Sequence, residues 1–457
     1  MQRVLSKEIE NNIGETVTMF GWVAARRDHG KIIFIDLRDR WGITQIVFDE
    51  KTYQLSSKLS PEDVIKVEGE VKERPKGLIN PKIISGKVEV QARNIEILAK
   101  SKTPPFEITD TSKISEDLRM KYRYLDLRTE RMKNNMILRH KIINFIRNYL
   151  CDKDFIEIET PILTKSTPEG SRDFLVPARL QKGKFYALPQ SPQQFKQLLM
   201  VGGIEKYFQI ARCLRDEDPR GDRQVEHTQL DMELSFVGGN DVMKQNEELI
   251  IAIIEKYFPK KTVPKPFPVL SYKEVMNKYQ TDKPDLRKDK NDKNELAFCW
   301  VTNFPFFKKD KEGKWTFTHN PFSDPVPDDK NKLIAGEIEV IKTTQYDLVL
   351  NGEEIAGGSI RSHEPKILEK VFAVLGYSKE EIKERFGHIL EAFEYGVPPH
   401  GGIAWGLDRL IMILQNEPSI REVIAFPKTG DGRDLMMNAP SEVDDDQLKE
   451  LKIKIQK

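Results

Sequence analysis

The chain has 457 residues, of which 39% are hydrophobic and 32% are charged, and its formal net charge is +1. This length predicts two or three domains, each able to bury a sizeable core. The nearly neutral balance excludes a strongly basic field over the whole molecule, so any contact with nucleic acid has to come from local patches.

The sequence carries no signal for a membrane or for an oxidising compartment. No run reaches the roughly 18 apolar residues of a membrane span, and the N-terminal MQRVLSKEIEN lacks the apolar core of a secretory signal. The three cysteines, Cys151, Cys213 and Cys299, are far apart and form no metal-binding or redox pair. We therefore expect a cytoplasmic protein without membrane contact.

Five short segments of alternating hydrophobicity occupy the first hundred residues. They are separated by Gly, Asp, Asn and Pro and cover residues 16–26, 31–39, 42–49, 64–73 and 86–98. Five strands in this length predict a small barrel. In the second segment Phe34 shares a face with Asp36 and Arg38, and an aromatic ring on a charged face can stack on an unpaired base. An ordinary exposed phenylalanine is the alternative.

A polar segment containing Pro104 and Pro105 follows and predicts an extended linker. We place the barrel at residues 1–100, the linker or hinge at 101–130 and a larger domain at 131–457.

The larger domain begins with a helix and a strand. Residues 134–150 carry apolar side chains at helical spacing and predict a buried helix, and residues 155–163 predict a strand that ends near Pro161. A second helix is expected at 188–203, because Pro192 suits the first turn of a helix.

The most informative stretch runs from Phe208 to Phe236 and predicts a strand, a loop and a strand. The loop DEDPRGDRQ has turn chemistry, and the second strand alternates apolar with polar residues. An arginine fork matches phosphate oxygens bidentately, so the hairpin suits a polyphosphate; a solvated hairpin with surface ion pairs is the alternative. The arginines are Arg212, Arg215, Arg220 and Arg223.

A second hairpin is predicted at residues 344–363 from the dipeptide Asn351-Gly352, which favours a two-residue type I′ turn. That turn makes Asp347 and Glu354 diagonal neighbours on one face. Two neighbouring carboxylates suit Mg²⁺, which also bridges phosphates; an edge hairpin with exposed charges is the alternative. Simple alternation would point Arg361 away from Glu354, so we predict a bulge or twist at the glycine pair that follows this turn.

The hairpin at 208–236 resembles motif 2 of the class II aminoacyl-tRNA synthetases, and nearly the whole chain is similar to bacterial-type aspartyl enzymes. Residues 134–163 resemble motif 1, which builds the homodimer interface in that family, and HGGIAWGLDRLIMILQN (400–416) resembles motif 3. The barrel resembles an anticodon-binding OB-fold. The resemblance implies an α+β protein: a five-stranded OB-fold barrel followed by a class II catalytic domain, with a mainly antiparallel sheet flanked by helices.

The resemblance also implies ATP-dependent ligation of L-aspartate to tRNA through an aspartyl-adenylate. It gives catalytic roles to Arg215 and Arg409 and a Mg²⁺ site to Asp347 and Glu354. The residues expected to bind aspartate are Glu169, Gln193, Gln194, Phe195, Lys196, Arg215, His319 and Arg361. The residues expected to bind ATP are Arg215, Asp216, Glu217, Gln224, Glu354, Gly406, Leu407, Asp408 and Arg409.

In the barrel, the resemblance implies anticodon contacts from Arg27, His29, Phe34 and Gln45. Enzymes of the family that charge only tRNA(Asp) commonly carry Leu at the position of His29, whereas those that also charge tRNA(Asn) tend to carry His. We therefore expect a non-discriminating enzyme. A discriminating aspartyl enzyme and an asparaginyl enzyme are the alternatives.

The chain departs from the bacterial pattern in one respect. Those enzymes usually carry an inserted domain of more than a hundred residues between motif 2 and the region of His319, but here residues 271–287 lead almost directly to LAFCWVTNFPFF. The catalytic motifs are intact, so only a tRNA contact made by that insert is in question.

Two rival functions are less favoured. A non-catalytic RNA-binding relative would be expected to lose Arg215, Glu354 or Arg409, and a ligase acting on free amino acids has no need of the barrel. No P-loop, no dinucleotide-binding glycine motif and no class I synthetase signature occurs in the sequence.

Overall fold

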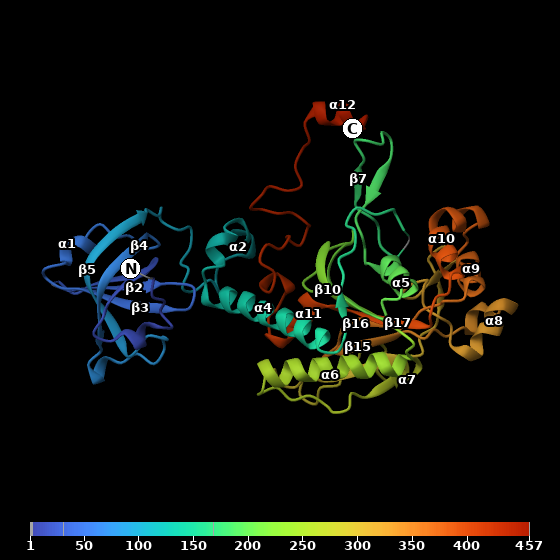
Figure 1. The fold of residues 1–457 in the computed structure, drawn as a ribbon, viewed down its shortest axis with the longest axis horizontal. Coiled ribbons are helices and arrows are strands. Elements are labelled where there is room, and N and C mark those ends of the chain that lie inside the picture. Colours follow the sequence, from blue (N-terminus) through green and yellow to red (C-terminus); the bar gives the residue numbers. More distant parts are fainter. Residues whose placement is uncertain (1–2, 31, 168, 457) are drawn as a thin grey trace. The chain divides into compact units, whose positions relative to one another are not determined.

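The computed structural model describes residues 3–30, 32–167 and 169–456, and the chain divides into two compact units (Figure 1). The first, called the barrel unit, contains the chain up to Ser115 together with Tyr124–Thr129. The second, called the sheet unit, contains Glu116–Arg123 and the chain from Glu130 onward. In the described part of the chain, no helix combines the length and the apolar character needed to cross a membrane.

The barrel unit confirms the five predicted strands. They close in the order β1-β2-β3-β5-β4, and their bounds are β1 (Thr16–Asp28), β2 (Ile33–Arg38), β3 (Ile43–Phe48), β4 (Val64–Glu73) and β5 (Val88–Ala99). In β2, Ile33, Ile35 and Leu37 fill the interior as the alternation predicts. Arg38, predicted to share a face with Phe34, is buried instead, because its guanidinium pairs with Glu62 at 2.5 Å.

Short helices connect these strands and lead toward the sheet unit. They are η1 (Ile9–Asn12), α1 (Tyr53–Ser56), η2 (Lys76–Leu78), α2 (Glu116–Lys121) and α3 (Arg123–Asp126). The region predicted as a linker therefore ends in helical turns.

The sheet unit is built on one eight-stranded sheet in the order β11-β12-β15-β16-β17-β10-β9-β6. Neighbouring strands are antiparallel except for the β6/β9 and β11/β12 pairs, which confirms a mainly antiparallel sheet. The strands are β6 (Ile156–Glu157), β9 (Lys206–Leu214), β10 (Glu226–Ser235), β11 (Val269–Ser271), β12 (Phe298–Thr302), β15 (Tyr346–Leu350), β16 (Glu353–Ile360) and β17 (His400–Gly406).

Helices and two small ribbons complete the unit. The ribbons are β7 (Leu175–Pro177) with β8 (Phe185–Ala187), and β13 (Phe307–Lys309) with β14 (Trp315–Phe317). The helices are α4 (Glu130–Cys151), α5 (Gln193–Val201), α6 (Gly239–Tyr257), α7 (Tyr272–Tyr279), η3 (Pro327–Asp329), α8 (Lys330–Ala335), η4 (Ile338–Val340), α9 (Pro365–Val374), α10 (Lys379–Glu394), α11 (Leu407–Leu414), η5 (Ile420–Glu422) and α12 (Asp445–Leu451).

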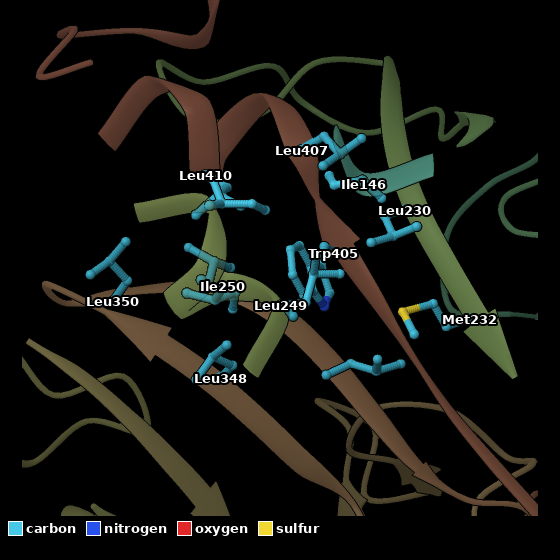
Figure 2. Packing of buried hydrophobic residues seen from close by; sticks show 14 of the residues in the cluster. Ile146, Leu230, Met232, Leu249, Ile250, Leu348, Leu350, Trp405, Leu407 and Leu410 are labelled. Atoms are coloured by element: carbon cyan, nitrogen blue, oxygen red, sulfur yellow. The ribbon is translucent and has the colours of Figure 1, made fainter. Parts of the chain in front are cut away.

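One face of the large sheet is a hydrophobic core that α4, α6 and α11 cover. Figure 2 shows Trp405 of β17 at its centre, beside Leu230 and Met232 of β10 and the helix side chains of Leu249 and Leu410. The buried indole of Trp405 donates its N–H to Asn246 on α6 at 2.7 Å, so the one polar group of this packed ring has a hydrogen-bond partner. The strict alternation of β10 then turns its acidic residues to the opposite face of the sheet.

The strand predicted at 155–163 is wrong from residue 158 on. Only Ile156–Glu157 pairs as β6, next to β9. Ile158 still donates its backbone N–H to Phe208 at 3.1 Å, but Pro161 has no N–H to offer a ladder. The apolar side chains that follow, Ile162 and Leu163, are 45% and 52% exposed.

The bulge predicted near the Gly357–Gly358 pair lies slightly earlier in the chain. Val349 pairs with Glu354 and Leu348 pairs with Ala356, so Ile355 is the extra residue. After this shift Asp347 pairs with Gly357, and Glu354, Gly357 and the residues at 359 and 361 share one face. The predicted reversal therefore occurs. The glycines serve close packing instead, because a Cβ on Gly358 would lie 2.2 Å from the carbonyl oxygen of Gly402.

Gly402 gives a test of this packing. A Cβ there would lie 2.1 Å from the carbonyl oxygen of Met232 and from a carboxylate oxygen of Glu233, so Gly402→Ala should lower the free energy of unfolding by about 2–3 kcal/mol. Gly387→Ala, inside α10 with no atom nearer than 3.7 Å, is the control and should stabilise by up to about 1 kcal/mol. Denaturant unfolding measures both, and equal stabilities would contradict the packing.

Candidate functional site

A buried cluster of four charges forms the centre of the polar face. Lys196 of α5 lies 3.0 Å from Asp231 and 3.1 Å from Glu233, both on β10. Arg361, just beyond β16, pairs with the same Glu233 at 2.9 Å, and each of these side chains is at most 3% exposed. The structure thus brings together the predicted residues Lys196 and Arg361. The two carboxylates that join them were missed, although the alternation of β10 placed both on one face.

The guanidinium of Arg361 keeps two N–H groups that no described residue accepts. Nε and Nη2 donate to the two oxygens of Glu233 at 2.9 and 3.1 Å, and Nη1 donates to the hydroxyl of Ser359 at 2.9 Å. A guanidinium has five N–H groups, so one hydrogen remains on Nη1 and one on Nη2. Charged donors of this kind suit a carboxylate.

The two acidic residues of the cluster differ in their ionisation. Burial would raise the pKa of Glu233, but Arg361 and Lys196 outweigh it and lower that pKa to about 2. For Asp231 burial dominates, and its pKa is raised. Its oxygen Oδ1 is buried and has no hydrogen-bond partner in the described structure. An incoming donor group would satisfy this acceptor.

The loop that carries Glu169 is held by one side chain. The amide of Gln190 accepts from the backbone N–H of Ser171 at 2.9 Å and donates to Ser171 O and to the carboxylate of Asp173 at 2.8 and 2.6 Å. Glu169 itself accepts from the hydroxyls of Thr167 and Ser191, and burial raises its pKa. Sequence reasoning found Glu169 but not Gln190, since a lone glutamine carries no pattern.

Of the remaining α5 residues predicted to bind the amino acid, one has a protein partner and two line a cavity. The amide of Gln193 donates to Gln197 at 3.0 Å. Gln194 and Phe195 line a cavity of about 280 Å³ together with Glu169, and the buried amide of Gln194 has no partner among the described residues. Their contact with a substrate stays a prediction.

The two predicted metal carboxylates meet around a glycine. A Cβ on Gly357 would lie 3.1 Å from an oxygen of Asp347 and 3.4 Å from an oxygen of Glu354, so the glycine keeps the space between them open. No group of three or more His, Cys, Asp or Glu side chains suited to a metal is found among the described residues. Two carboxylates nevertheless fit Mg²⁺, which commonly takes one or two carboxylates plus substrate phosphates and water.

The ionisation of this pair also involves His319. Burial together with Asp347 raises the pKa of Glu354 to about 7. Burial disfavours the charged form of His319, but Asp347, 2.9 Å from its Nε2, and Glu354 outweigh burial and raise the pKa to about 9. The structure therefore places His319 against the predicted metal carboxylates, while Arg361 lies with Glu233.

A second cavity, of about 110 Å³, lies at the arginines of the first hairpin. Arg409 donates from Nη2 to Asp222 at 2.9 Å and from Nη1 to the backbone of Glu354. Arg215 reaches the carbonyl of Gln190 at 3.4 Å. The lining residues are Arg215, Glu217, Asp222, Arg223, Gln224, His227, Gly406, Asp408, Arg409 and Ile420. Four arginine and glutamine donors around one small cavity suit a polyphosphate.

Several residues predicted to bind ATP already have protein partners. The amide of Gln224 bonds twice to the backbone of Lys428, at 2.7 and 3.0 Å. Asp408 accepts from Arg139 and from the backbone N–H of Thr228, and Leu407 is fully buried in the core. Asp216 and Glu217 bond to the loop that carries Glu169. The backbone N–H of Asp216 donates to the carbonyl of Arg172, and the carboxylate of Glu217 accepts from the hydroxyl of Ser171. Their direct contact with a nucleotide stays a prediction.

The barrel unit gathers its predicted residues on one face. Arg27 pairs bidentately with Asp36 at 2.7 Å and lies opposite Phe34 in the β1/β2 ladder. The ring of His29 meets Phe34 edge to face at 5.5 Å. In the next ladder Gln45 lies opposite Asp36 and donates to Glu89 at 2.9 Å.

A further cation on the barrel was missed by sequence reasoning. Arg74 is only 7% exposed, its Nη2 has no partner among the described residues, and burial lowers its pKa. Its position after β4 gave no alternating pattern from which burial could be read.

Comparisons with known proteins cover both units. A family model described as tRNA synthetases class II (D, K and N) matches residues 115–430, and one described as OB-fold nucleic acid binding domain matches residues 17–98. A protein of Rubrobacter xylanophilus named aspartate–tRNA(Asp/Asn) ligase is 41% identical over 97% of this chain and 95% of its own length. A protein of Dehalococcoides mccartyi with the same name is 42% identical over 98% of both.

Solved structures share the fold at lower identity. Asparaginyl-tRNA synthetase of Pyrococcus horikoshii, complexed with asparaginyl-adenylate, matches with a TM-score of 0.77 and 24% identity, covering 94% of this chain and 98% of its own. Aspartyl-tRNA synthetase of Entamoeba histolytica matches with a TM-score of 0.74 and 23% identity, covering 93% and 91%.

The lengths also agree with a missing insert. The alignment with the Rubrobacter relative runs over 572 residues, whereas this chain has 457. The relative therefore carries more than a hundred residues that this chain lacks.

His227, which lines the second cavity, should make the stability of the folded chain depend on pH. Burial and the charges of Arg215, Arg212 and Arg409 lower its pKa to about 3, against an ordinary value of about 6.5. Between those values the unfolded chain binds a proton that the folded chain does not, so stability is lost as the pH falls. His227→Phe should make the slope shallower by up to about 1.4 kcal/mol per pH unit. Urea unfolding between pH 7 and pH 5 measures it, with His140→Gln on α4 as control; an unchanged slope would contradict the assignment.

Proposed function

The chain belongs to the class II tRNA synthetases of the D, K and N group, and we propose that it ligates L-aspartate to both tRNA(Asp) and tRNA(Asn) at the expense of ATP. The observation that carries the choice of amino acid is the pair of free N–H groups on Arg361, which Glu233 holds in a buried cluster of charges beside Lys196. Names of the relatives support the choice of aspartate and of both tRNAs.

Hydrogen bonding explains the selection of aspartate over asparagine. In the folded chain Lys196 and Arg361 are balanced by Asp231 and Glu233, and the two remaining N–H groups of Arg361 have no acceptor among the described residues. A side-chain carboxylate satisfies both donors, whereas a carboxamide offers one acceptor and places its NH₂ against a donor. The unpaired oxygen of Asp231 is suited to the substrate ammonium group.

The reaction proceeds in two steps. The α-carboxylate of aspartate attacks the α-phosphorus of ATP, the bond to the bridging oxygen breaks, and pyrophosphate leaves. A hydroxyl of the terminal ribose of tRNA then attacks the acyl carbon, and AMP leaves. In the first step Arg215 and Arg409 neutralise charge on the phosphates, and the cluster around Arg361 orients aspartate.

Asp347 and Glu354 are the residues that would hold Mg²⁺, and the ion would neutralise charge on the phosphates of ATP. The space kept by Gly357 and the pKa of Glu354, raised to about 7 by burial and by Asp347, support the pairing, because a cation between the two carboxylates relieves their repulsion.

The anticodon of the tRNA is proposed to contact the barrel face that carries Arg27, Phe34 and Gln45. His29, whose ring lies beside Phe34, is proposed to extend charging to tRNA(Asn). Phe34 is partly exposed and can stack on a base. The relatives' extra residues are absent here, so the proposed tRNA contact of this chain lies on the barrel and the sheet unit.

Homodimer formation is also proposed. Exposed apolar side chains lie in β6, shortly after it and in the β7/β8 ribbon, namely Ile156, Ile162, Leu163, Leu175 and Phe185, at 45–59% exposure. Apolar side chains concentrated on one segment mark an interface more often than scattered ones do. The cytoplasmic location stays a prediction.

Arg361 tests the choice of amino acid. Arg361→Leu should reduce aspartate-dependent exchange of pyrophosphate into ATP by at least about a thousandfold, because the substrate carboxylate loses its partner and Glu233 is left unpaired. Arg361→Lys keeps the charge beside Glu233 without the fork, and should retain the fold while losing most of the activity. Near-normal exchange by either variant, or wild-type exchange that depends on asparagine instead, would rule out the assignment.

His29 tests the choice of tRNA. The wild-type chain should charge transcripts of tRNA(Asp) and tRNA(Asn) with radiolabelled aspartate at comparable kcat/KM. His29→Leu should lower kcat/KM for tRNA(Asn) by about tenfold or more, equivalent to losing one contact of about 1.4 kcal/mol, and leave pyrophosphate exchange unchanged. If wild-type enzyme charges only tRNA(Asp), dual charging is wrong and the ligase assignment stands. If neither is charged while exchange runs, the lost insert has removed tRNA binding.

A further inference from the structure

Ser359 lies on β16, two residues before Arg361, and none of the steps above uses it. Its side chain is fully buried, and its hydroxyl oxygen accepts the hydrogen bond from Nη1 of Arg361 at 2.9 Å. Among the described residues, Glu233 and Ser359 together hold all three nitrogens of that guanidinium. The bulge at Ile355 is what puts Ser359 and Arg361 on the same face.

Ser359 is itself held by a chain of buried polar groups. Its hydroxyl lies 2.9 Å from that of Ser323, and the Ser323 hydroxyl also lies 3.3 Å from the amide oxygen of Asn320 and 3.5 Å from that of Gln345. The amide nitrogen of Gln345 donates to Asp347 at 2.6 Å. Apart from Asn320, these side chains are at most 4% exposed, so bulk water does not compete for their hydrogen bonds. The row of polar groups runs from the proposed metal carboxylate to the arginine.

We propose that Ser359 is a positioning residue that holds the two free N–H groups of Arg361 toward the side chain of the amino-acid substrate, with Ser323 and Gln345 behind it. This inference rests on the proposed function. Glu233 fixes one edge of the guanidinium, but a contact along a single edge still allows the group to tilt about the line joining the two carboxylate oxygens. The third contact, at Nη1, removes that freedom, and the two free N–H groups are presented in one orientation.

Loss of the Ser359 hydroxyl should affect binding of the amino acid and not binding of ATP. A misoriented Arg361 weakens the contact with the aspartate side chain, which is far along the substrate from the reacting α-carboxylate. Arg215 and Arg409 have no contact with Ser359 in the described structure. Asp347 keeps its hydrogen bond from Gln345 when the Ser359 hydroxyl is removed, so the nucleotide side is undisturbed. Removal of the hydroxyl should therefore raise KM for aspartate and leave KM for ATP and kcat nearly unchanged.

The chain offers a matched control three residues later. Ser362 is also fully buried and just beyond β16, but its hydroxyl has no hydrogen-bond partner among the described residues. Ser359→Ala and Ser362→Ala thus make the same chemical change in comparable surroundings, and only the first removes a contact with Arg361. Ser323→Ala removes the support of Ser359 and keeps the direct contact.

The experiment is aspartate-dependent exchange of pyrophosphate into ATP by the purified full chain, with thermal unfolding of each variant. For Ser359→Ala we expect KM for aspartate to rise about 10- to 100-fold, the loss of one hydrogen bond to a charged group, with KM for ATP and kcat within twofold of wild type. Ser362→Ala should match wild type, and Ser323→Ala should show the same split with a smaller rise.

Two results would overturn the proposal. One is a KM for aspartate in Ser359→Ala within twofold of that in Ser362→Ala. The other is an equal rise in the KM values for aspartate and ATP, which indicates a general structural loss. If Ser359→Ala unfolds well below Ser362→Ala, Ser323→Ala decides by the same split. Wild-type chain without aspartate-dependent exchange would instead refute the proposed function.

Discussion

The ion pair between Arg361 and Glu233 is almost completely buried, and the arrangement around it follows from that. Removing two charges from water costs several kcal/mol per ion, and their attraction offsets this only with good geometry and further hydrogen bonds. Here the geometry is bidentate, Lys196 gives Glu233 a second cation, and Ser359 occupies the third nitrogen. A rigid support is therefore a requirement of the pair itself, and a substrate carboxylate meets a guanidinium that is already oriented.

That support comes from the hydrophobic face of the same strands. Leu230 and Met232 alternate with Asp231 and Glu233 along β10, so the packing around Trp405 fixes the position of each carboxylate on the opposite side (Figure 2). Gly402 on β17 then brings its backbone against Glu233, where any side chain would collide. The hydrophobic core and the charged site thus lie on opposite faces of the same strand, and a change in the register of β10 would move both.

Alternation and turn chemistry predict the parts of this site that lie on one strand or one hairpin. The Asn351-Gly352 turn, with φ values of 52° and 88°, set the register that brings Asp347 and Glu354 together, and the acidic face of β10 could be read directly. The pairing of Glu233 with Arg361 could not, because the two residues are 128 positions apart and only the strand order of the finished sheet makes them neighbours. The bulge was predicted at the glycines because glycine favours bulges, whereas it lies at Ile355. Burial of Arg38 and Arg74 depends on partners distant in sequence and left no local signal.

The connection between α7 and β12, where the sequence resemblance predicts that an inserted domain is missing, is closed by local packing. Leu286 packs against the small cluster of Val275, Cys299 and Val349, and Arg287 pairs with Asp285 at 2.8 Å within the same connection. The end of β12 is therefore covered by local packing, and the β12/β15 ladder from Phe298 to Thr302 is complete. Asp347 lies on the second strand of that ladder, opposite Val301, so the strand that carries a predicted metal ligand is held in register without the missing residues.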